Sequence, residues 1–474
     1  MIRDILGKEI LRNLLSLRFA LAMLLSLALF TANSLVFVHQ YRQEAQEYWR
    51  HTNENLAEFS ARAEQLNKLA FYQQKLWKRP RALALCASGS EKYLPPFFVA
   101  DVFRVDLRAL ENQGNFLLPI YSDVDWVFII STLFSFVAIA FTYDAFSGEK
   151  QAGTLRLTLS HSVPRNAVFL GKYLGALVSL GMPLFAGLIV SLIIVVTSGV
   201  LPVATSQWGG ILTIAVLSVA YLSLFVLVGL FVSSRTAHPA TGIVILLSVW
   251  VTFVLLIPSL GRILSDTYHK SPSLTDFYRR VVETKNQIHA DMQAGKYGEN
   301  AFEAWPDRDH PGNNPPAAAR FWSAFVESVD RIHDDQHHRM LAQARAGRRI
   351  ARVSPVAIYQ QASETIAGTG VERYARLYRQ IRDYQDALKA FILEQDAENP
   401  NSLHLLFPFN YAVEHWEAIS KRPVDFDAVP KFQERDLALG ASLRLAILDI
   451  GLLILFNLVF FAAAFVSFLR YDVR

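Results

Sequence analysis

The chain has 474 residues, of which 52% are hydrophobic and 19% charged, and its formal net charge is +4 at pH 7. The hydrophobic residues gather in long runs that alternate with polar sequence, which is typical of a membrane protein and excludes an ordinary soluble domain. The basic residues cluster in short loops beside these runs, so the positive charge indicates membrane topology and argues against nucleic-acid binding.

Residues 1–18 predict an amphipathic helix that lies in the plane of the lipid headgroups. Apolar residues recur at helical spacing and basic residues take the other faces, as Ile2, Leu6, Ile10, Leu14 and Leu17 against Arg3, Lys8 and Arg12. A basic segment that only flanks the first span is the alternative interpretation. The apolar run that follows is too long for a signal peptide, so we expect an uncleaved span.

Six apolar runs are long enough to cross a bilayer about 30 Å thick as helices. With their flanking turns, the spans are predicted at 19–38, 124–143, 168–198, 209–233, 240–264 and 437–469. Lys and Arg concentrate before the first span, after the second and fourth, and in the tail 470–474, whereas the loop 199–208 has none. By the positive-inside rule both termini are cytoplasmic, and we expect a bacterial inner (cytoplasmic) membrane.

Two large segments, 39–123 and 265–436, lie outside by this topology. Amphipathic helical patterns are predicted at 40–77, 274–293, 317–349 and 371–394. We expect the two segments to fold together into one mainly helical extracytoplasmic domain. The predicted fold is therefore an all-α polytopic membrane protein with six transmembrane helices, an N-terminal interfacial helix and this domain. Cys86 is the only cysteine, so no disulfide within the chain is possible.

The cytoplasmic loop 144–167 predicts a short helix with one semi-apolar face. Leu155 and Leu159 lie four residues apart, and Gly153 and Pro164 bracket the helix. A short two-faced helix between spans suits insertion into a groove on another protein. The alternative is a loop whose charges only fix the orientation of the chain in the membrane.

The loop resembles the cytoplasmic signature of ABC-2 type permeases. The residues that carry the resemblance are Gly148, Glu149, Lys150, Gly153, Thr154, Leu155, Arg156, Pro164 and Arg165, followed by Gly171 and Lys172. The layout of spans is similar to that family across nearly all membrane portions, and the two insertions resemble its subgroup with a large periplasmic domain. The resemblance implies a coupling helix that docks onto a separate ATPase subunit, and a second permease copy or a related permease.

No segment fits the GxxxxGK[ST] pattern, so we expect ATP and Mg²⁺ to be bound by the partner ATPase subunit, with no cofactor bound directly and no enzymatic activity in this chain. Glu149 and Arg156 are expected to pair with complementary charges on that partner, and Gly153 to permit a bend. The resemblance thus implies a permease subunit that couples ATP hydrolysis to export or extraction of an unidentified substrate.

Three alternatives stay open. The first is an ATP-driven mechanical relay that acts on a periplasmic partner without passing a solute through the spans. The second is an ion-coupled carrier that uses Asp449, a carboxylate inside the last span, with Asn457 as a further polar candidate there. A hydrogen bond between helices explains Asp449 equally well. The third is a receptor or scaffold that transports nothing.

Eight of the twelve histidines lie in the second external segment, where His333 and His337 are one helical turn apart beside His338. This spacing is compatible with a Zn or Cu site. A solvated helix face is the preferred interpretation, so we expect no metal.

Overall fold

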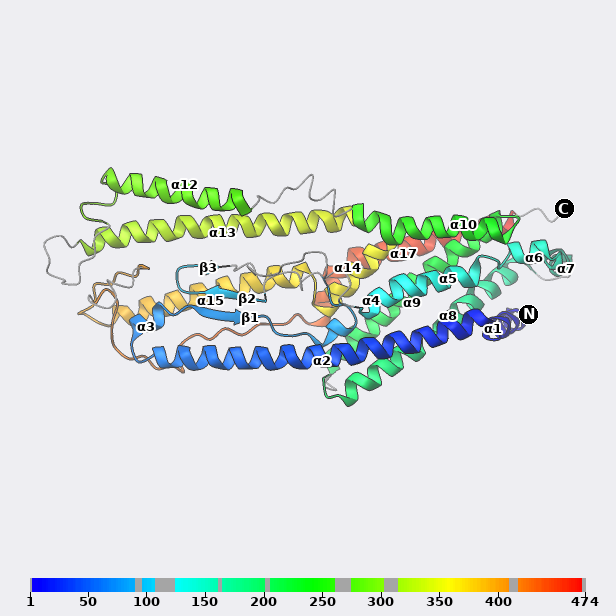
Figure 1. Ribbon diagram of the computed structural model, residues 1–474, viewed down its shortest axis with the longest axis horizontal. Coiled ribbons are helices and arrows are strands. Elements are labelled where there is room, and N and C mark those ends of the chain that lie inside the picture. The colour runs from blue at the N-terminus through cyan, green and yellow to red at the C-terminus, as the bar shows by residue number, and fades with distance from the viewer. Residues whose placement is uncertain are drawn as a thin grey trace.

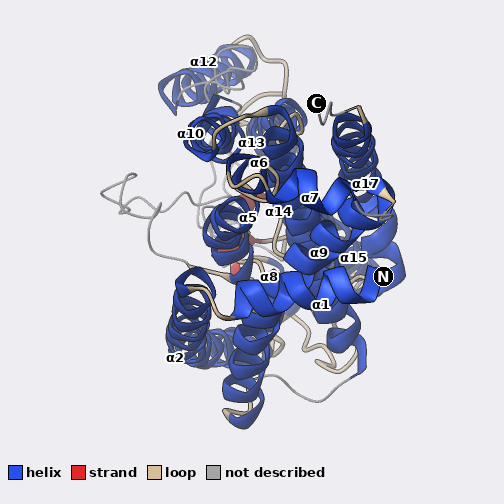
Figure 2. Cartoon of the chain, turned by 90° about the vertical axis from the view of Figure 1, so that its right-hand side faces the viewer, coloured by secondary structure: helices blue, strands red, loops and turns tan. Residues whose placement is uncertain are grey.

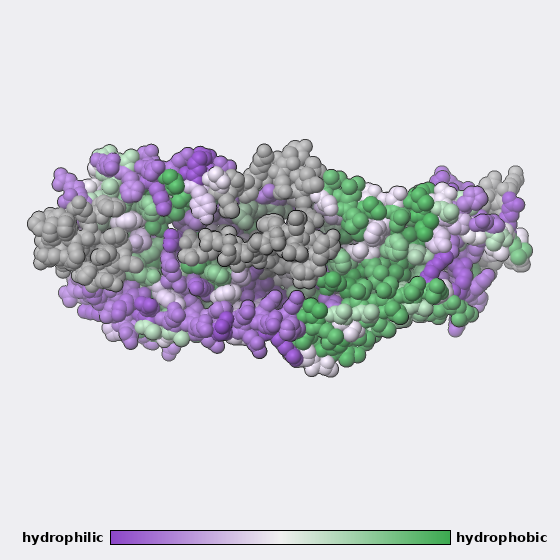
Figure 3. Space-filling model, in the orientation of Figure 1, coloured by the Kyte–Doolittle hydropathy of each residue, from purple (hydrophilic) through white to green (hydrophobic). Residues whose placement is uncertain are grey.

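The computed structural model describes residues 2–89, 96–106, 124–160, 164–200, 205–260, 274–301, 314–408 and 417–470. The molecule is elongated, with a helix bundle that carries the N-terminus at one end and a second domain at the other (Figure 1). Hydrophobic residues cover the visible surface of the bundle, and hydrophilic residues cover much of the second domain (Figure 3). The change from one surface to the other marks where the bilayer ends on this face.

Six helical segments are long and apolar enough to cross a membrane: Leu17–Arg62, Trp126–Gln151, Arg165–Thr197, Gln207–Arg235, Pro239–Leu260 and Leu439–Leu469. The six predicted spans are thereby confirmed. Their elements are α2 (Leu17–Arg62), α4 (Trp126–Phe128), η4 (Ile129–Phe134), α5 (Ser135–Thr142), α6 (Ser147–Gln151), α8 (Arg165–Thr197), α9 (Thr205–Arg235), α10 (Pro239–Trp250), η5 (Val251–Leu256) and α17 (Leu439–Leu469). Both η4 and η5 are π-helical.

The first span continues far beyond the membrane. A short helix, α1 (Ile2–Leu14), precedes it, and the hydroxyl of Ser16 caps α2 by accepting a hydrogen bond from the backbone N–H of Phe19 at 3.2 Å. From there α2 runs for 46 residues without a glycine or proline, a length of about 69 Å. The sequence predicted a span and a separate external helix, but in the structure the two form one continuous helix.

The first external segment contains a small sheet that the sequence analysis missed. The predicted helix at 40–77 is wrong beyond Arg62, because α3 (Leu66–Ala70) and a strand, β1 (Gln74–Trp77), follow it. Along β1 buried and exposed side chains alternate, which is the period of a strand. The other elements are η1 (Ala82–Leu85), β2 (Phe97–Ala100) and β3 (Val105–Asp106), and the three strands are antiparallel in the order β1-β2-β3.

The second external segment is helical, as predicted. Its helices are α12 (Leu274–Gln293), α13 (Pro315–Ala351), α14 (Pro355–Ala367) and α15 (Val371–Ala397). Three of them match the predicted helices closely, whereas α14 was not predicted. Of the α14 side chains, only Gln360 and Thr365 are not buried, because this helix packs against α17 and α9 in the outer part of the bundle.

The two external segments share one core. Phe59 and Phe98 from the first segment pack with Tyr374 and Ile381 from the second. The side-chain amide of Gln74 on β1 also donates a 2.8 Å hydrogen bond to the hydroxyl of Tyr384, 310 residues away on α15. Chain-distant contacts of this kind make the domain one folding unit built from both insertions.

A buried ion-pair network closes the same domain. Glu434 accepts hydrogen bonds from Arg373 at 2.9 and 3.0 Å and from Arg81 at 2.5 Å. The side chains of Arg373 and Glu434 are each 5% exposed. Because these groups come from three separate stretches of the chain, the network joins both insertions to the segment that leads into the last span.

Candidate coupling site

Two short helices lie at the end of the bundle that carries the N-terminus: α6, which ends the second apolar segment, and α7 (Thr154–Ser160), which follows it. Gly153 separates them with a φ of 73°, a left-handed conformation that favours glycine. Leu155 is 1% exposed and anchors α7 to the bundle, whereas Leu157 is 63% exposed. The helix is therefore packed on one side and exposed to solvent on the other.

A cluster of four charged groups, two of which are buried, packs against this region and supports it. The ammonium of Lys172 on α8 donates hydrogen bonds to Glu9 at 2.8 Å and to Glu149 at 2.7 Å. The guanidinium of Arg12 lies 2.5 Å from Glu9 and 3.6 Å from Glu149. The side chains of Lys172 and Glu9 are 3% and 7% exposed, whereas those of Glu149 and Arg12 are 19% and 46% exposed. The Lys172–Glu9 pair is therefore buried, and Arg12 balances the second carboxylate from the surface.

This cluster joins three elements that are separate in sequence: α1, α6 and α8. Figure 2 looks onto this end of the molecule, where α1 lies across the bundle near α6 and α7. Close packing supports the cluster, since a Cβ placed at Gly171 of α8 would lie 2.6 Å from Ile5 of α1. Glu149 is thus occupied within the chain, and a contact of its carboxylate with a partner stays a prediction. Arg156 is exposed on α7.

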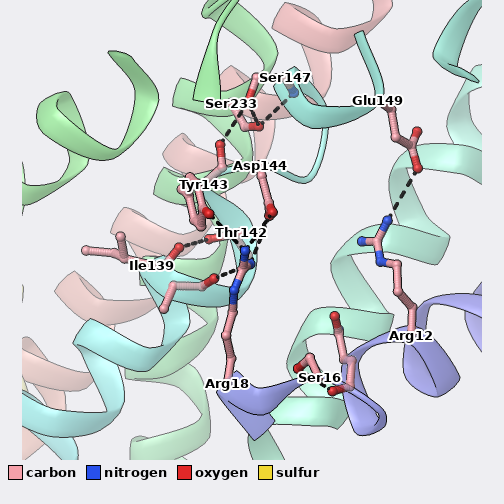
Figure 4. A network of polar contacts seen from close by, with 12 residues as sticks. Arg12, Ser16, Arg18, Ile139, Thr142, Tyr143, Asp144, Ser147, Glu149 and Ser233 are labelled. Atoms are coloured by element: carbon pink, nitrogen blue, oxygen red, sulfur yellow. Dashed lines mark hydrogen bonds and ion pairs between the residues drawn. The ribbon is translucent and has the colours of Figure 1, made fainter. Parts of the chain in front are cut away.

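A second polar contact fixes the first span to the end of the second. Arg18, in the first turn of α2, donates hydrogen bonds to the two carboxylate oxygens of Asp144 at 2.9 and 3.2 Å and to the hydroxyl of Tyr143 at 2.8 Å (Figure 4). The hydroxyl of Ser233 on α9 accepts hydrogen bonds from the backbone N–H groups of Phe146 and Ser147 at 3.0 and 3.1 Å. The start of α6 is therefore tied to spans one and four.

Two basic residues of this region cap the C-terminal ends of other spans. The ammonium of Lys150 donates to the backbone carbonyls of Ser234 and Thr236 at 2.6 and 3.2 Å, at the end of α9. The guanidinium of Arg165 donates to the carbonyl of Leu469 at 2.7 Å, the last residue of α17. Cations at helix C-termini satisfy carbonyls that lack an intrahelical partner and oppose the negative end of the helix dipole.

The remaining predicted site residues have local roles. A Cβ at Gly148 would lie 3.3 Å from that of Asp144, so the glycine sits close to the preceding turn. The hydroxyl of Thr154 lies 3.4 Å from the carbonyl of Glu149, and Pro164 is the N-cap of α8. Residues 161–163 and the side chain of Leu159 fall outside the part of the chain that the structure describes.

Asp449, the carboxylate predicted inside the last span, pairs with a residue of the external segment. Arg352 at the end of α13 donates from Nε to Oδ1 at 2.6 Å and from a terminal nitrogen to Oδ2 at 3.2 Å. The carboxylate is 3% exposed and the guanidinium 27%. Arg444, five residues earlier on α17, is exposed. Asp449 therefore belongs to a junction between the bundle and the external domain.

Asn457 links three spans. Its side-chain oxygen accepts a 2.8 Å hydrogen bond from Ser223 on α9, whose hydroxyl lies 2.7 Å from that of Tyr173 on α8. Its amide nitrogen donates to the carbonyls of Ala220 and Leu453. Asn457 also borders an apolar groove of about 510 Å³ between α8, α9 and α17. The hydrogen bonds make it an interhelical connection.

The three histidines of the possible metal site, His333, His337 and His338, each contact a different neighbour. The ring of His333 contacts Phe277 edge-on, His337 stacks on Tyr378 with ring centroids 3.7 Å apart, and His338 lies 3.4 Å from Asp334. Within the described residues, no group of three or more His, Cys, Asp or Glu side chains is placed to hold a metal ion.

His337 makes the external domain sensitive to mild acid. Burial, reinforced by the neighbouring His338, lowers its pKa from 6.5 to about 4. Below pH 6.5 the unfolded chain binds a proton that the folded chain does not, so we expect stability to fall by about 3 kcal/mol between pH 6.5 and 4. Thermal unfolding of the full chain across this range measures the loss.

The variant His337→Phe keeps the stacking and removes the titration, so its stability should vary less over this pH range. The comparison variant is His338→Gln, which removes an exposed neighbour but leaves His337 buried. Because burial is the main cause of the lowered pKa, this variant should retain most of the wild-type dependence. An identical pH dependence in wild type and His337→Phe would contradict the assignment.

Sequence reasoning missed two residues of these sites. It read Lys172 as part of a signature without recognising it as the centre of an ion-pair cluster, although a lysine seven residues into a span is itself a signal of a paired charge. It also left Asp449 without a partner, because Arg352 is 97 residues away in a segment assigned to the exterior.

A model of the family described as "ABC-2 family transporter protein" matches residues 3–473 of the chain. No curated protein matches the chain.

Proposed function

Since this chain belongs to the ABC-2 transporter family, we propose that it is the permease subunit of an ABC transporter and that a separate subunit hydrolyses ATP to drive export or extraction of a substrate. We further propose that it works beside a second copy or a related permease in a bacterial inner membrane, with both termini in the cytoplasm. The external domain would then face the periplasm.

The observation that carries the coupling proposal is α7, which is anchored by Leu155 and presents Arg156 and Leu157 outward. An exposed apolar side chain beside a cation, on a helix anchored to the bundle, is complementary to a groove on a partner that has an apolar floor and an acidic rim. Movement imposed on α7 reaches α6 through the Gly153 turn. From α6 it passes through Glu149 and Lys150 into α8, α1 and α9.

The test is association with the ATPase subunit that co-purifies with this chain from its native membrane. We expect Leu157→Glu and Arg156→Glu each to weaken association at least tenfold, because each removes an exposed contact without touching the bundle; tenfold corresponds to about 1.4 kcal/mol. Co-purification in detergent, followed by titration of the purified ATPase, measures it. The control is Lys8→Glu, the same charge reversal at an exposed residue of α1. Undiminished association of both α7 variants would refute docking through this helix.

A mechanical relay remains a second candidate function because one observation favours it. The unbroken helix α2 starts at the Arg18 to Asp144 contact in the cytoplasmic part and ends inside the core of the external domain. A straight rod of this kind passes a tilt at one end to the other. The ion-coupled carrier is less well supported, because an incoming cation must displace Arg352 from Asp449.

A further inference from the structure

The last span, α17, is held at both ends by residues of other elements. At the cytoplasmic end, Arg165 donates to the carbonyl of Leu469, and the ring of Phe468 stacks on that of Phe146 with centroids 4.4 Å apart. Phe146 immediately precedes α6, and Arg165 opens the helix that follows the coupling loop. The end of α17 is therefore in direct contact with both sides of that loop.

In its outer half, ten residues after its first residue Leu439, α17 is held by the two-point ion pair between Asp449 and Arg352. Asp449 lies about 30 Å along the helix from Leu469. Two residues beyond Arg352, the hydroxyl of Ser354 donates a 2.5 Å hydrogen bond to the carbonyl of Phe253. Phe253 belongs to η5, and π-helical turns inside helices are frequently found at functional sites. The turn between α13 and α14 is thus fastened to spans five and six together.

Beyond this turn the connection to the external domain is stiff. The guanidinium of Arg348 on α13 donates a 2.6 Å hydrogen bond to Glu364 on α14, and the amide of Gln361 donates to the carbonyl of Arg348 at 2.9 Å. α14 is in turn buried in the bundle, where the hydroxyl of Tyr359 lies 2.7 Å from that of Ser218. From this root α13 extends for 37 residues, about 56 Å, and carries α12 along its length (Figure 1).

We propose that α17 transmits movement of the coupling loop to the external domain. Arg352 is the positioning residue through which α17 changes the angle of α13. A two-point ion pair constrains the relative orientation of the two helices as well as their distance, because both of its charged groups are planar. An apolar contact at the same place would hold α13 without setting its angle. This inference rests on the proposed function, since the ATPase subunit supplies the movement.

The experiment measures the distance between the α12 arm and α2 in the complete complex. Spin labels are placed at Val282→Cys on α12 and Leu56→Cys on α2, both exposed, while the native Cys86 is buried and not labelled. Pulsed electron resonance compares the nucleotide-free complex with the vanadate-trapped complex in nanodiscs. We expect the wild-type distance distribution to shift on trapping.

The double variant Arg352→Gln with Asp449→Asn removes both charges and leaves no unpaired ion in the junction. We expect its shift to be at least twofold smaller, while ATPase association and thermal stability stay close to wild type. The charge-swapped pair Arg352→Asp with Asp449→Arg should recover at least part of the shift. The control is Arg345→Gln, on the same helix as Arg352. It removes an exposed ion pair with Glu372 of α15 and should leave the distance shift intact.

Two results overturn the inference. One is a full-sized shift in the double neutral variant, which would show that α13 moves without the ion pair. The other is a wild-type complex that binds the ATPase and hydrolyses ATP with no change in distance. Failure of the wild-type chain to bind the ATPase at all is a different outcome, because it refutes the proposed function itself.

Discussion

The chain with Lys172→Met is expected to have a free energy of unfolding about 3–5 kcal/mol below that of the wild type. Methionine keeps the volume and removes the cation that bridges Glu9 and Glu149. Arg12 is 46% exposed and lies 3.6 Å from Glu149, so it cannot neutralise both carboxylates. Denaturant unfolding of the purified full chain in detergent micelles, followed by tryptophan fluorescence, measures the difference.

Two further variants make this prediction specific. The same substitution at the exposed Lys8 should change stability by no more than about 0.5 kcal/mol. The triple variant Glu9→Gln, Glu149→Gln and Lys172→Met should recover most of the lost stability, because no unpaired charge remains buried. If Lys172→Met is as stable as Lys8→Met, the cluster does not hold α1 and α6 to the bundle.

The second large effect is expected at Glu434, in the network that closes the external domain. Burial alone would raise the pKa of this carboxyl, but the hydrogen bonds and charges of Arg373 and Arg81 outweigh burial and lower the pKa from 4.5 to about 2. Between these pH values the unfolded chain binds a proton that the folded chain excludes. The contribution of Glu434 to stability is therefore complete above about pH 4.5, and about 3 kcal/mol of it is lost as the pH falls to about 2.

Glu434→Gln should lower the unfolding free energy by about 3–5 kcal/mol at neutral pH, because it leaves the buried Arg373 without its carboxylate, whereas Arg81 keeps its ion pair with Asp436. The difference from the wild type should then shrink as the pH approaches 2, where the wild-type carboxyl is itself protonated. Circular dichroism melting curves of the full chain at successive pH values measure both effects. Glu283→Gln, at an exposed acid on α12, is the control and should follow the wild-type curve. A constant gap between Glu434→Gln and wild type at all pH values would contradict the assignment.

Hydropathy was sufficient to predict the spans, because a bilayer requires long apolar helices whatever packs beside them. The helices at 274–293, 317–349 and 371–394 were likewise predictable from their amphipathic period. The short helix α14 was within reach of the sequence too. Ser354 and Pro355 form an N-cap with proline at the first position, and Gly368 adopts a left-handed C-cap with a φ of 68°.

The roles of the charged residues could not be predicted in the same way. Lys172 pairs with both Glu9 and Glu149 only because the fold brings α1 and α6, which carry these carboxylates, to the same part of α8. Arg352 reaches Asp449 only because α14 enters the bundle and brings the end of α13 with it. Local pattern identifies which residues carry charge, whereas packing between distant segments decides which charges meet.

The hydrogen bond between Gln74 and Tyr384 has a consequence for biosynthesis. Its two partners are separated by 310 residues, and a ribosome that adds about 5–20 residues per second takes about 15–60 s to make the intervening chain. In the proposed topology, the first insertion crosses the membrane during that time, before the surface on which its small sheet rests has been made. The newly made protein should therefore be open to proteases and chaperones outside until its last insertion follows, and pulse-labelled chains should become protease-resistant only after that delay.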